Sequence, residues 1–217
     1  MAASDALEKM LDDCDAKVLF LSDQYRSLVE PYETRIAKLI AGGRIAYDFR
    51  RAGWRDFDTW LAPASDAPFE VPLGPLDDFN IIYSSGTTGL PKIVMHHQAR
   101  WFAFDRFADR IAGFGASDVF LSALPAPFGF GLWTAHFSPA IAGAPCVVIE
   151  RFTAETVCAA IEEHGVTVLA AVSTQFLMML QSPAFAAHDL SSLRVAIHAA
   201  APCRIMSCHA NYSALAS

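Results

Sequence analysis

The sequence predicts an α/β fold in which strands and helices alternate around a largely parallel sheet. From residue 79 onward, short apolar strand candidates are separated by segments with helical spacing, which is the pattern of βαβ units. The strand candidates are continuous apolar runs, as expected for parallel strands that are buried on both faces. At 217 residues, the chain is long enough to build a sizeable core.

Before residue 79, the sequence predicts one strand, one helix and a connector. The apolar run at residues 17–21 predicts a short strand that is buried on both faces. Residues 24–41 have apolar side chains at helical spacing and are followed by two glycines, which predicts a helix. Four prolines and few apolar runs in residues 62–78 predict an exposed connector.

The elements expected after the connector alternate regularly between strands and helices. The expected strands cover residues 79–83, 119–124, 146–149, 166–172 and 193–197. The expected helices cover residues 96–112, 131–142, 154–164 and 174–180. Thr153 is a candidate N-cap for the third of these helices, and Gly165 is its candidate C-terminal stop.

Charge is distributed unevenly along the chain. Residues 1–80 carry 24 of the 39 Asp, Glu, Lys and Arg side chains, and residues 81–217 carry the other 15. The net charge of −7 and the absence of basic clusters argue against binding to nucleic acid. The low charge of residues 81–217 is consistent either with a membrane span or with the interior of a larger folded structure.

Two long runs without charged residues test the membrane alternative. Residues 119–149 and 164–188 contain no Asp, Glu, Lys or Arg, but both are interrupted by proline, glycine or polar residues. Proline at that density breaks the backbone ladder, and lipid offers no replacement hydrogen bonds. We therefore expect no membrane span. Acidic residues near the N-terminus replace the basic and apolar segments of a signal peptide, which predicts a cytoplasmic protein.

The cysteines and histidines indicate neither a disulfide framework nor a metal site. The five cysteines are scattered and include no C-x-x-C pair. The seven histidines include no H-E-x-x-H or comparable ligand spacing. We expect Cys146 and Cys158 to be small core residues, and His96 and His97 to lie at the start of a helix.

The segment that follows the strand candidate at 79–83 carries the clearest chemical signal. It reads SSGTTGLPK from Ser84 to Lys92. Glycines allow backbone N–H groups to converge on an anion, hydroxyls add donors, and a lysine supplies a charge suited to phosphate. The spacing fits neither a P-loop nor the dinucleotide-binding or serine-hydrolase motifs. The residues that we expect to bind phosphate are Ser84, Ser85, Gly86, Thr87, Thr88, Gly89 and Lys92.

Residues 81–92 resemble the phosphate-loop signature of the AMP-forming, adenylate-forming enzymes. This superfamily includes acyl-CoA synthetases, the adenylation domains of peptide synthetases and firefly luciferase. Residues 15–28, 166–180 and 190–203 resemble further parts of the same domain. The resemblance implies that residues 15–203 align continuously with the middle of the large N-terminal domain, so that the chain is a partial domain of this α/β fold.

The resemblance also implies a two-step reaction with ATP, Mg²⁺ and coenzyme A. A carboxylate attacks the α-phosphorus of ATP, giving an acyl-adenylate and pyrophosphate, and the thiol of coenzyme A then displaces AMP. The implied partners are a small-molecule carboxylate, ATP and coenzyme A, with fatty acid metabolism as one setting. Among the loop residues, Thr87, Thr88 and Lys92 are the first candidates for contacts with the phosphates.

Further site residues follow from the resemblance, each with a structural alternative. Phe128 stands where many relatives have a histidine and is a gate between the acyl pocket and the thiol tunnel, or else a packed core residue. His198 contacts the acyl group, or else is a buried histidine with its hydrogen bonds satisfied. The implied acyl-pocket or gate residues are Phe128, Gly131 and His198, and the implied adenine-side turn is Ala199, Ala200 and Ala201.

Several family motifs do not occur in this sequence. The motif whose glutamate helps to hold magnesium, the ribose-binding aspartate and the catalytic lysine are not found, so no catalytic residue is assigned. Three readings follow: part of an acyl-CoA ligase that is not competent alone, an inactive truncated remnant that at most binds nucleotide, or adenylation for another acyl acceptor. We also expect exposed apolar surface and a protein partner that covers it.

The expected organisation has four parts. Residues 1–61 form a strand–helix region, and residues 62–78 form a connector. Residues 79–203 form a partial AMP-dependent synthetase/ligase domain, and residues 204–217 form a tail that does not fit the family.

Overall fold

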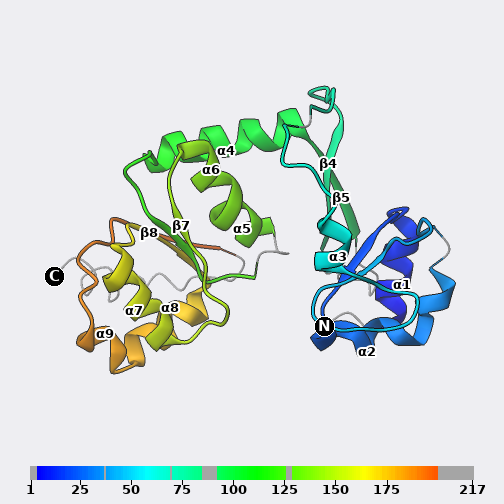
Figure 1. The fold of residues 1–217 in the computed structure, drawn as a ribbon. Helices are drawn as coiled ribbons and strands as arrows, with labels where there is room; N and C mark the ends of the chain where they lie inside the picture. The colour runs from blue at the N-terminus through cyan, green and yellow to red at the C-terminus, as the bar shows by residue number, and fades with distance from the viewer. Residues whose placement is uncertain (1–3, 37, 69, 85–91, 126–128, 200–217) are drawn as a thin grey trace. The chain divides into compact units, whose positions relative to one another are not determined.

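The structure, a computed structural model, divides into two compact units (Figure 1). It describes residues 4–36, 38–68, 70–84, 92–125 and 129–199. The first unit is formed by Met1–Gly74 and Tyr83–Met95, and the second by Pro75–Ile82 and His96–Ser217. Strands β4 and β5 therefore contribute residues to both units.

The first unit is built on a three-stranded parallel sheet in the order β1-β2-β3. Its strands are β1 (Leu19–Leu21), β2 (Arg44–Ala46) and β3 (Arg55–Asp56). Its helical segments are α1 (Ser4–Asp13), η1 (Asp23–Tyr25), α2 (Arg26–Val29), η2 (Glu30–Arg35) and α3 (Phe57–Leu61). The core between them contains buried Leu21, Val29, Tyr32, Ile36, Ala46 and Phe49.

Two expectations for this unit were wrong. The single helix expected over residues 24–41 is instead the short series η1, α2 and η2, because Pro31 cannot donate a backbone hydrogen bond and stops the α-helix. The first strand is buried on one face only, since Phe20 is 42% exposed. The Phe20 ring packs instead in a half-exposed aromatic cluster, with ring centroids 5.4 Å from Trp60 and 5.9 Å from Tyr47.

Strands β4 (Asp78–Ser84) and β5 (Lys92–His97) pair with each other. Two side-chain contacts link them in antiparallel order, from Ser84 Oγ to the Lys92 carbonyl at 3.4 Å and between Asn80 Oδ1 and His96 Nδ1 at 2.9 Å. The first strand was expected from the sequence and is confirmed. The second was not expected, because His96 was assigned to the following helix and the apolar run before it is only three residues long.

The second unit contains a four-stranded parallel sheet in the order β7-β6-β8-β9 (Figure 1). Its strands are β6 (Phe120–Ser122), β7 (Cys146–Val147), β8 (Val168–Ala171) and β9 (Val195–His198). Its helices are α4 (Gln98–Ala112), α5 (Gly129–Leu132), the π-helical η3 (Trp133–Phe137), α6 (Ser138–Ala142), α7 (Ala154–His164), α8 (Ser173–Gln181) and α9 (Ala184–Ala187). This confirms the predicted α/β fold with a parallel sheet.

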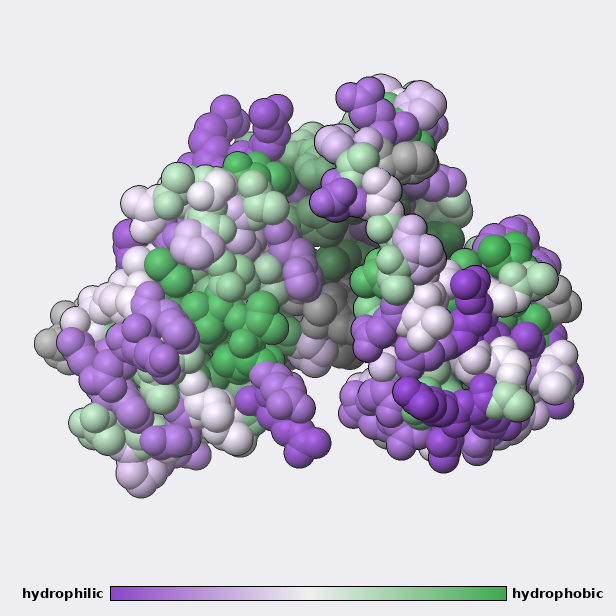
Figure 2. All heavy atoms as spheres, viewed as in Figure 1, coloured by the Kyte–Doolittle hydropathy of each residue, from purple (hydrophilic) through white to green (hydrophobic). Residues whose placement is uncertain are grey.

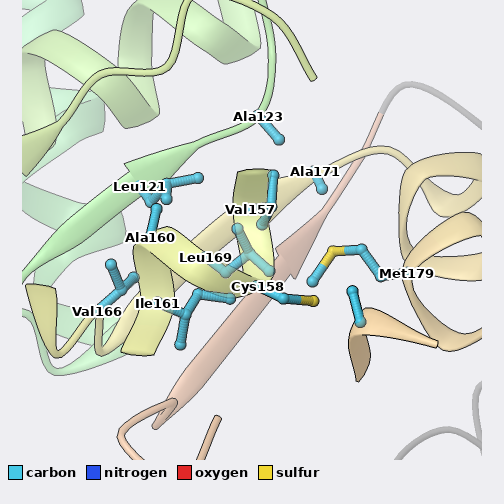
Figure 3. Packing of buried hydrophobic residues seen from close by; sticks show 11 residues of the cluster. Leu121, Ala123, Val157, Cys158, Ala160, Ile161, Val166, Leu169, Ala171 and Met179 are labelled. Carbon is cyan, nitrogen blue, oxygen red and sulfur yellow. The ribbon is translucent and has the colours of Figure 1, made fainter. Parts of the chain in front are cut away.

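Helices cover both faces of this sheet. Helices α4, α5 and α6 lie on one face, and α7, α8 and α9 lie on the other (Figure 1). On the second face, Leu121 and Leu169 of the strands meet Val157 and Ile161 of α7, and each side chain is at most 1% exposed (Figure 3). Burial on both faces explains why these strands are continuous apolar runs.

The caps of α7 are those expected from the sequence. The Thr153 side chain accepts a hydrogen bond from the backbone N–H of Thr156, and the Thr156 hydroxyl accepts one from the backbone N–H of Thr153, which completes a capping box. At the other end, Gly165 adopts a left-handed conformation with φ of 61°. These local interactions fix both ends of the helix that covers the core.

Asp118 ties the amino ends of the strands together. Its carboxylate accepts hydrogen bonds from Thr167 Oγ1 at 2.7 Å, from the Gly115 backbone N–H at 3.0 Å and from Nε and Nη2 of Arg194 at 2.8–3.2 Å. Burial alone would raise the pKa of Asp118, but the hydrogen bonds from Thr167 and Arg194 outweigh it and lower the pKa. This ionic cluster therefore joins the loop after α4 to the start of β6, β8 and β9.

Apolar side chains are also exposed on the surface of each unit. Figure 2 shows apolar residues gathered on part of the surface of the second unit. On the outer side of α4, Phe104, Phe107 and Ile111 are 51%, 55% and 70% exposed and alternate with exposed arginines. Within the described residues, no helix is both long and apolar enough to cross a lipid bilayer.

The passage from β6 to α5 includes a close backbone approach at Gly131. A Cβ atom at this position would lie 2.3 Å from the Pro125 carbonyl oxygen, which is too close for any side chain. The Thr134 hydroxyl donates to the Phe130 carbonyl at 2.8 Å and forms a second hydrogen bond with the Ser122 hydroxyl, 3.0 Å away. These contacts fold the segment back over the carboxyl end of β6.

The inner side of α4 carries two buried carboxyl groups. Asp105 is fully buried, and neither carboxylate oxygen has a hydrogen-bond partner among the described residues. Asp109 accepts a hydrogen bond from Ser138 Oγ at 2.5 Å. Burial, with a smaller effect of the Asp109 charge, raises the pKa of Asp105 to about 7. Burial also raises the pKa of Asp109, against the opposing effect of Ser138.

The raised pKa predicts a pH-dependent effect of the substitution Asp105→Asn. Because the folded-state pKa lies above the ordinary value of 3.8, wild-type stability falls as the pH rises through the interval between these values. We expect Asp105→Asn to increase the free energy of unfolding by roughly 1–3 kcal/mol more at pH 8 than at pH 4.5. Urea denaturation at the two pH values measures this difference. The exposed Asp66→Asn is the control, and an equal gain at both pH values would contradict the prediction.

The close approach at Gly131 predicts that Gly131→Ala is destabilising. The added methyl group must displace the Pro125 backbone, and such overpacking costs about 1–3 kcal/mol. The matched control is Gly115→Ala, since no described atom lies within 4 Å of a Cβ at Gly115. We expect the control to change stability by less than about 0.5 kcal/mol in the same denaturation experiment. Equal stabilities of the two variants would show that the approach at Gly131 is not tight.

Candidate functional site

The carboxyl ends of three strands meet at one edge of the second unit's sheet. In the parallel register, Ser122 of β6 pairs with Ala170 of β8, and Ala171 of β8 pairs with His198 of β9. The chain then leaves the sheet after each strand. This edge thus gathers residues that are far apart in the sequence.

The topology creates a switch point between β6 and β8. The connection that follows β6 leads to β7, whereas the connection that follows β8 leads to β9, and these two strands lie on opposite sides of the pair. In open parallel sheets, ligands bind in the crevice outside the carboxyl ends of two such strands. The carboxyl ends of β6 and β8 are therefore the candidate site in this unit.

A glutamine bridges the two strands at the switch point. Gln175 in the first turn of α8 donates from Nε2 to the Ala123 carbonyl at 2.7 Å. Its Oε1 accepts from the Val172 backbone N–H at 3.0 Å. The side chain thereby connects the backbone that follows β6 to the turn that follows β8.

Strand β4 contacts the same edge. A Cβ atom at Gly129 would lie 3.3 Å from Ile82 Cδ1, so the end of β4 packs closely on the start of α5. The amino end of β4 is held by aromatic packing, since the ring centroid of Phe79 lies 5.1 Å from that of Phe137 and 6.0 Å from that of Trp101. These contacts fix the strand that leads into the hydroxyl-rich segment.

The structure describes the two ends of that segment. Ser84 ends β4 and Lys92 begins β5, and both side chains are exposed. The hydrogen bond from Ser84 Oγ to the Lys92 carbonyl brings these ends together. The intervening candidate residues, Ser85, Gly86, Thr87, Thr88 and Gly89, lie outside the described residues.

The remaining expected site residues fall at the carboxyl edge or outside the described part. Gly131 is buried beneath Pro125, and Ala199 follows β9 directly. His198 is exposed at the end of β9, so the alternative of a buried histidine is wrong. Phe128, Ala200 and Ala201 lie outside the described residues.

Sequence reasoning missed Gln175 and Ser122, which both lie at this edge. Ser122 is 7% exposed and its hydroxyl is hydrogen-bonded to that of Thr134. A signal for both was present, because Ser122 is the hydroxyl residue inside the apolar strand candidate at 119–124, and Gln175 lies in the first turn of the expected helix at 174–180. Their partners, however, are set by contacts between distant segments.

The described residues contain no group of three or more His, Cys, Asp and Glu side chains arranged to hold a metal ion. The half-buried His188 lies between Glu162 and Glu155, whose hydrogen bonds raise its pKa. The described residues therefore do not form a Mg²⁺ site without further oxygen ligands.

Comparison with known proteins gives consistent results over almost the whole chain. Residues 1–211 match the family described as AMP-binding enzyme. The indoleacetate–CoA ligase of Aromatoleum aromaticum is 31% identical, over 86% of this chain and 36% of its own length. The 4-hydroxybenzoate–CoA/benzoate–CoA ligase of Rhodopseudomonas palustris is 30% identical, over 92% of this chain and 37% of its own length.

Solved structures agree with these sequence matches. The anthranilate CoA ligase AuaEII in complex with anthranoyl-AMP superimposes with a TM-score of 0.85 and 25% identity, covering 93% of this chain and 39% of that one. The N-terminal domain of FACL13 from Mycobacterium tuberculosis has the same TM-score at 23% identity and shares the fold. The chain spans about a third of the length of the curated relatives it matches. The alignment over residues 1–211 shows that this chain belongs to the AMP-binding enzyme family.

Proposed function

We propose that this chain provides the phosphate-binding and acyl-binding parts of an enzyme that joins a carboxylic acid to coenzyme A. The observation that carries the proposal is the segment SSGTTGLPK between the paired strands β4 and β5. Membership of the AMP-binding enzyme family supports it. The switch point between β6 and β8 supports a second, acyl-binding region in the same chain.

The proposed reaction has two balanced steps. A carboxylate oxygen of the acid attacks the α-phosphorus of ATP, and the bond from that phosphorus to the pyrophosphate oxygen breaks. The thiol of coenzyme A, after losing its proton, then attacks the acyl carbon, and AMP leaves with the oxygen that joined it to the acid. Donors that hold the departing phosphates stabilise the charge that develops on them.

The proposed roles of the residues follow the two regions. Backbone N–H groups and hydroxyls of the loop donate to the β- and γ-phosphates, and Lys92 adds a positive charge. The residues proposed for the phosphates are Ser84, Ser85, Gly86, Thr87, Thr88, Gly89 and Lys92. Those proposed for the acyl group are Phe128, Gly131 and His198, and those for the adenine side are Ala199, Ala200 and Ala201.

We propose an aromatic acid as the carboxylate. Relatives named for indoleacetate, 4-coumarate, benzoate and 4-hydroxybenzoate support this class. In this chain, His198 is exposed at the carboxyl edge and offers a polar or stacking contact to an aromatic ring. Coenzyme A as the second substrate rests on the same relatives.

We propose that residues 79–203 act as a partial synthetase domain and that further protein covers its exposed apolar surface. The outer side of α4, with Phe104, Phe107 and Ile111, supports the second part of this proposal. About half or more of each of these side chains stays in contact with solvent.

The phosphate-binding loop predicts that ATP stabilises the wild-type chain against thermal unfolding. A ligand that binds only the folded state stabilises it by about 2.7 kcal/mol at a concentration 100 times its Kd. We expect the double substitution Thr88→Ala with Lys92→Ala to abolish this ATP-dependent rise in Tm, because it removes a hydroxyl donor and the lysine charge.

Lys17→Ala serves as the matched control, since Lys17 is another exposed lysine of the first unit. It should leave the ATP-dependent rise unchanged. Persistence of the full rise in the double variant would refute the assignment of the loop.

A further inference from the structure

We propose that Gln175 is a positioning residue, which sets the wall of the acyl-binding region by holding the backbone after β6 against the start of α8. This inference deepens the proposed function and rests on it. Gln175 is half-buried at the switch point between β6 and β8. It is not among the residues proposed above for the phosphates, the adenine side or the acyl group.

Both functional atoms of the Gln175 side chain are used, and they are used for different purposes. Oε1 accepts from the Val172 backbone N–H at 3.0 Å, which satisfies a donor at the start of α8. Nε2 donates to the Ala123 carbonyl at 2.7 Å, across 52 residues of sequence. The first bond is a local helix cap, and the second is a tertiary clamp.

The amide is required for the clamp but not for the cap. At the third helical position, Glu and Gln cap equally well because both supply an acceptor oxygen. A carboxylate, however, has no N–H to donate to a carbonyl oxygen. The substitution Gln175→Glu therefore separates the two functions, because it preserves the acceptor and removes the donor.

Ala123, which directly follows β6, is hydrogen-bonded through its backbone to both β8 and Gln175. Ala123 is 6% exposed, and its N–H donates to the Ala170 carbonyl of β8 at 2.8 Å. The Ala123 carbonyl oxygen accepts the hydrogen bond from Gln175 Nε2. Beyond Ala123, the backbone reaches the Pro125 carbonyl, which packs against Gly131. A shift at Ala123 is therefore transmitted through Pro125 to Gly131, which is proposed to line the acyl group.

The experiment compares two ligands that share the nucleotide but differ in the acyl group. The probes are ATP and the stable acyl-adenylate analogue 5′-O-(N-benzoylsulfamoyl)adenosine, each titrated calorimetrically into the 217-residue chain. For Gln175→Glu, we expect the Kd of the benzoyl analogue to rise about tenfold, which corresponds to roughly 1.4 kcal/mol, while the Kd of ATP changes less than about twofold.

Two further variants separate the clamp from other effects. Gln175→Met removes both hydrogen bonds and should weaken the analogue at least as much as Gln175→Glu. Gln181→Glu makes the same chemical change at the exposed last position of α8 and should leave both affinities unchanged. Hydrogen exchange should become faster in residues 119–125 of Gln175→Glu but stay unchanged in α7.

The outcomes are distinguishable. If the wild-type chain binds both probes and Gln175→Glu binds the analogue as tightly as the wild type, only the Gln175 proposal fails. The Gln175 proposal also fails if hydrogen exchange in residues 119–125 is unaltered, because the substitution then has no effect on this backbone. It fails as well if exchange in α7 rises too, because the effect is then not specific to the segment after β6. If the wild-type chain binds neither probe, the proposed function fails and takes this proposal with it.

Discussion

Parallel pairing of β6, β8 and β9 is the constraint on which the candidate site depends. Because the three strands run in the same direction and in register, their carboxyl ends place Ser122, Ala171 and His198 at one edge. Asp118 reinforces the register at the opposite edge, where it joins Thr167 and Arg194. A slip of one residue would reverse the face on which every side chain lies, so this anchoring also protects the core.

The two ends of the sheet are stabilised by different physical means. The amino edge is held by a buried carboxylate whose charge is compensated by a guanidinium and by hydrogen-bond donors. The carboxyl edge is held by neutral contacts, namely the amide of Gln175 and the close approach at Gly131. These contacts add no charge to that edge, which suits a region proposed to receive an aromatic acyl group.

The sequence predicted the parts of the fold that are decided locally. The Thr153 cap and the Gly165 stop of α7 follow from the preferences of single residues, and both are confirmed. The expected helix over residues 24–41 failed because apolar spacing was given more weight than Pro31. Strand β5 was not expected because its apolar run, Ile93 to Met95, is only three residues long and has no period that distinguishes a strand from a loop.

The sequence by itself determined the α/β class, the family resemblance and the candidate phosphate loop, since each depends on residues that are adjacent in the chain. Only the tertiary structure decided the strand order, the position of the switch point, the exposure of His198 and the partner of Gln175. These features arise from contacts between segments that are 52 residues apart in the case of Gln175 and Ala123, and 76 residues apart in the case of Arg194 and Asp118. Such pairings depend on which strands become neighbours, and hydrophobic patterning specifies only that the strands are buried.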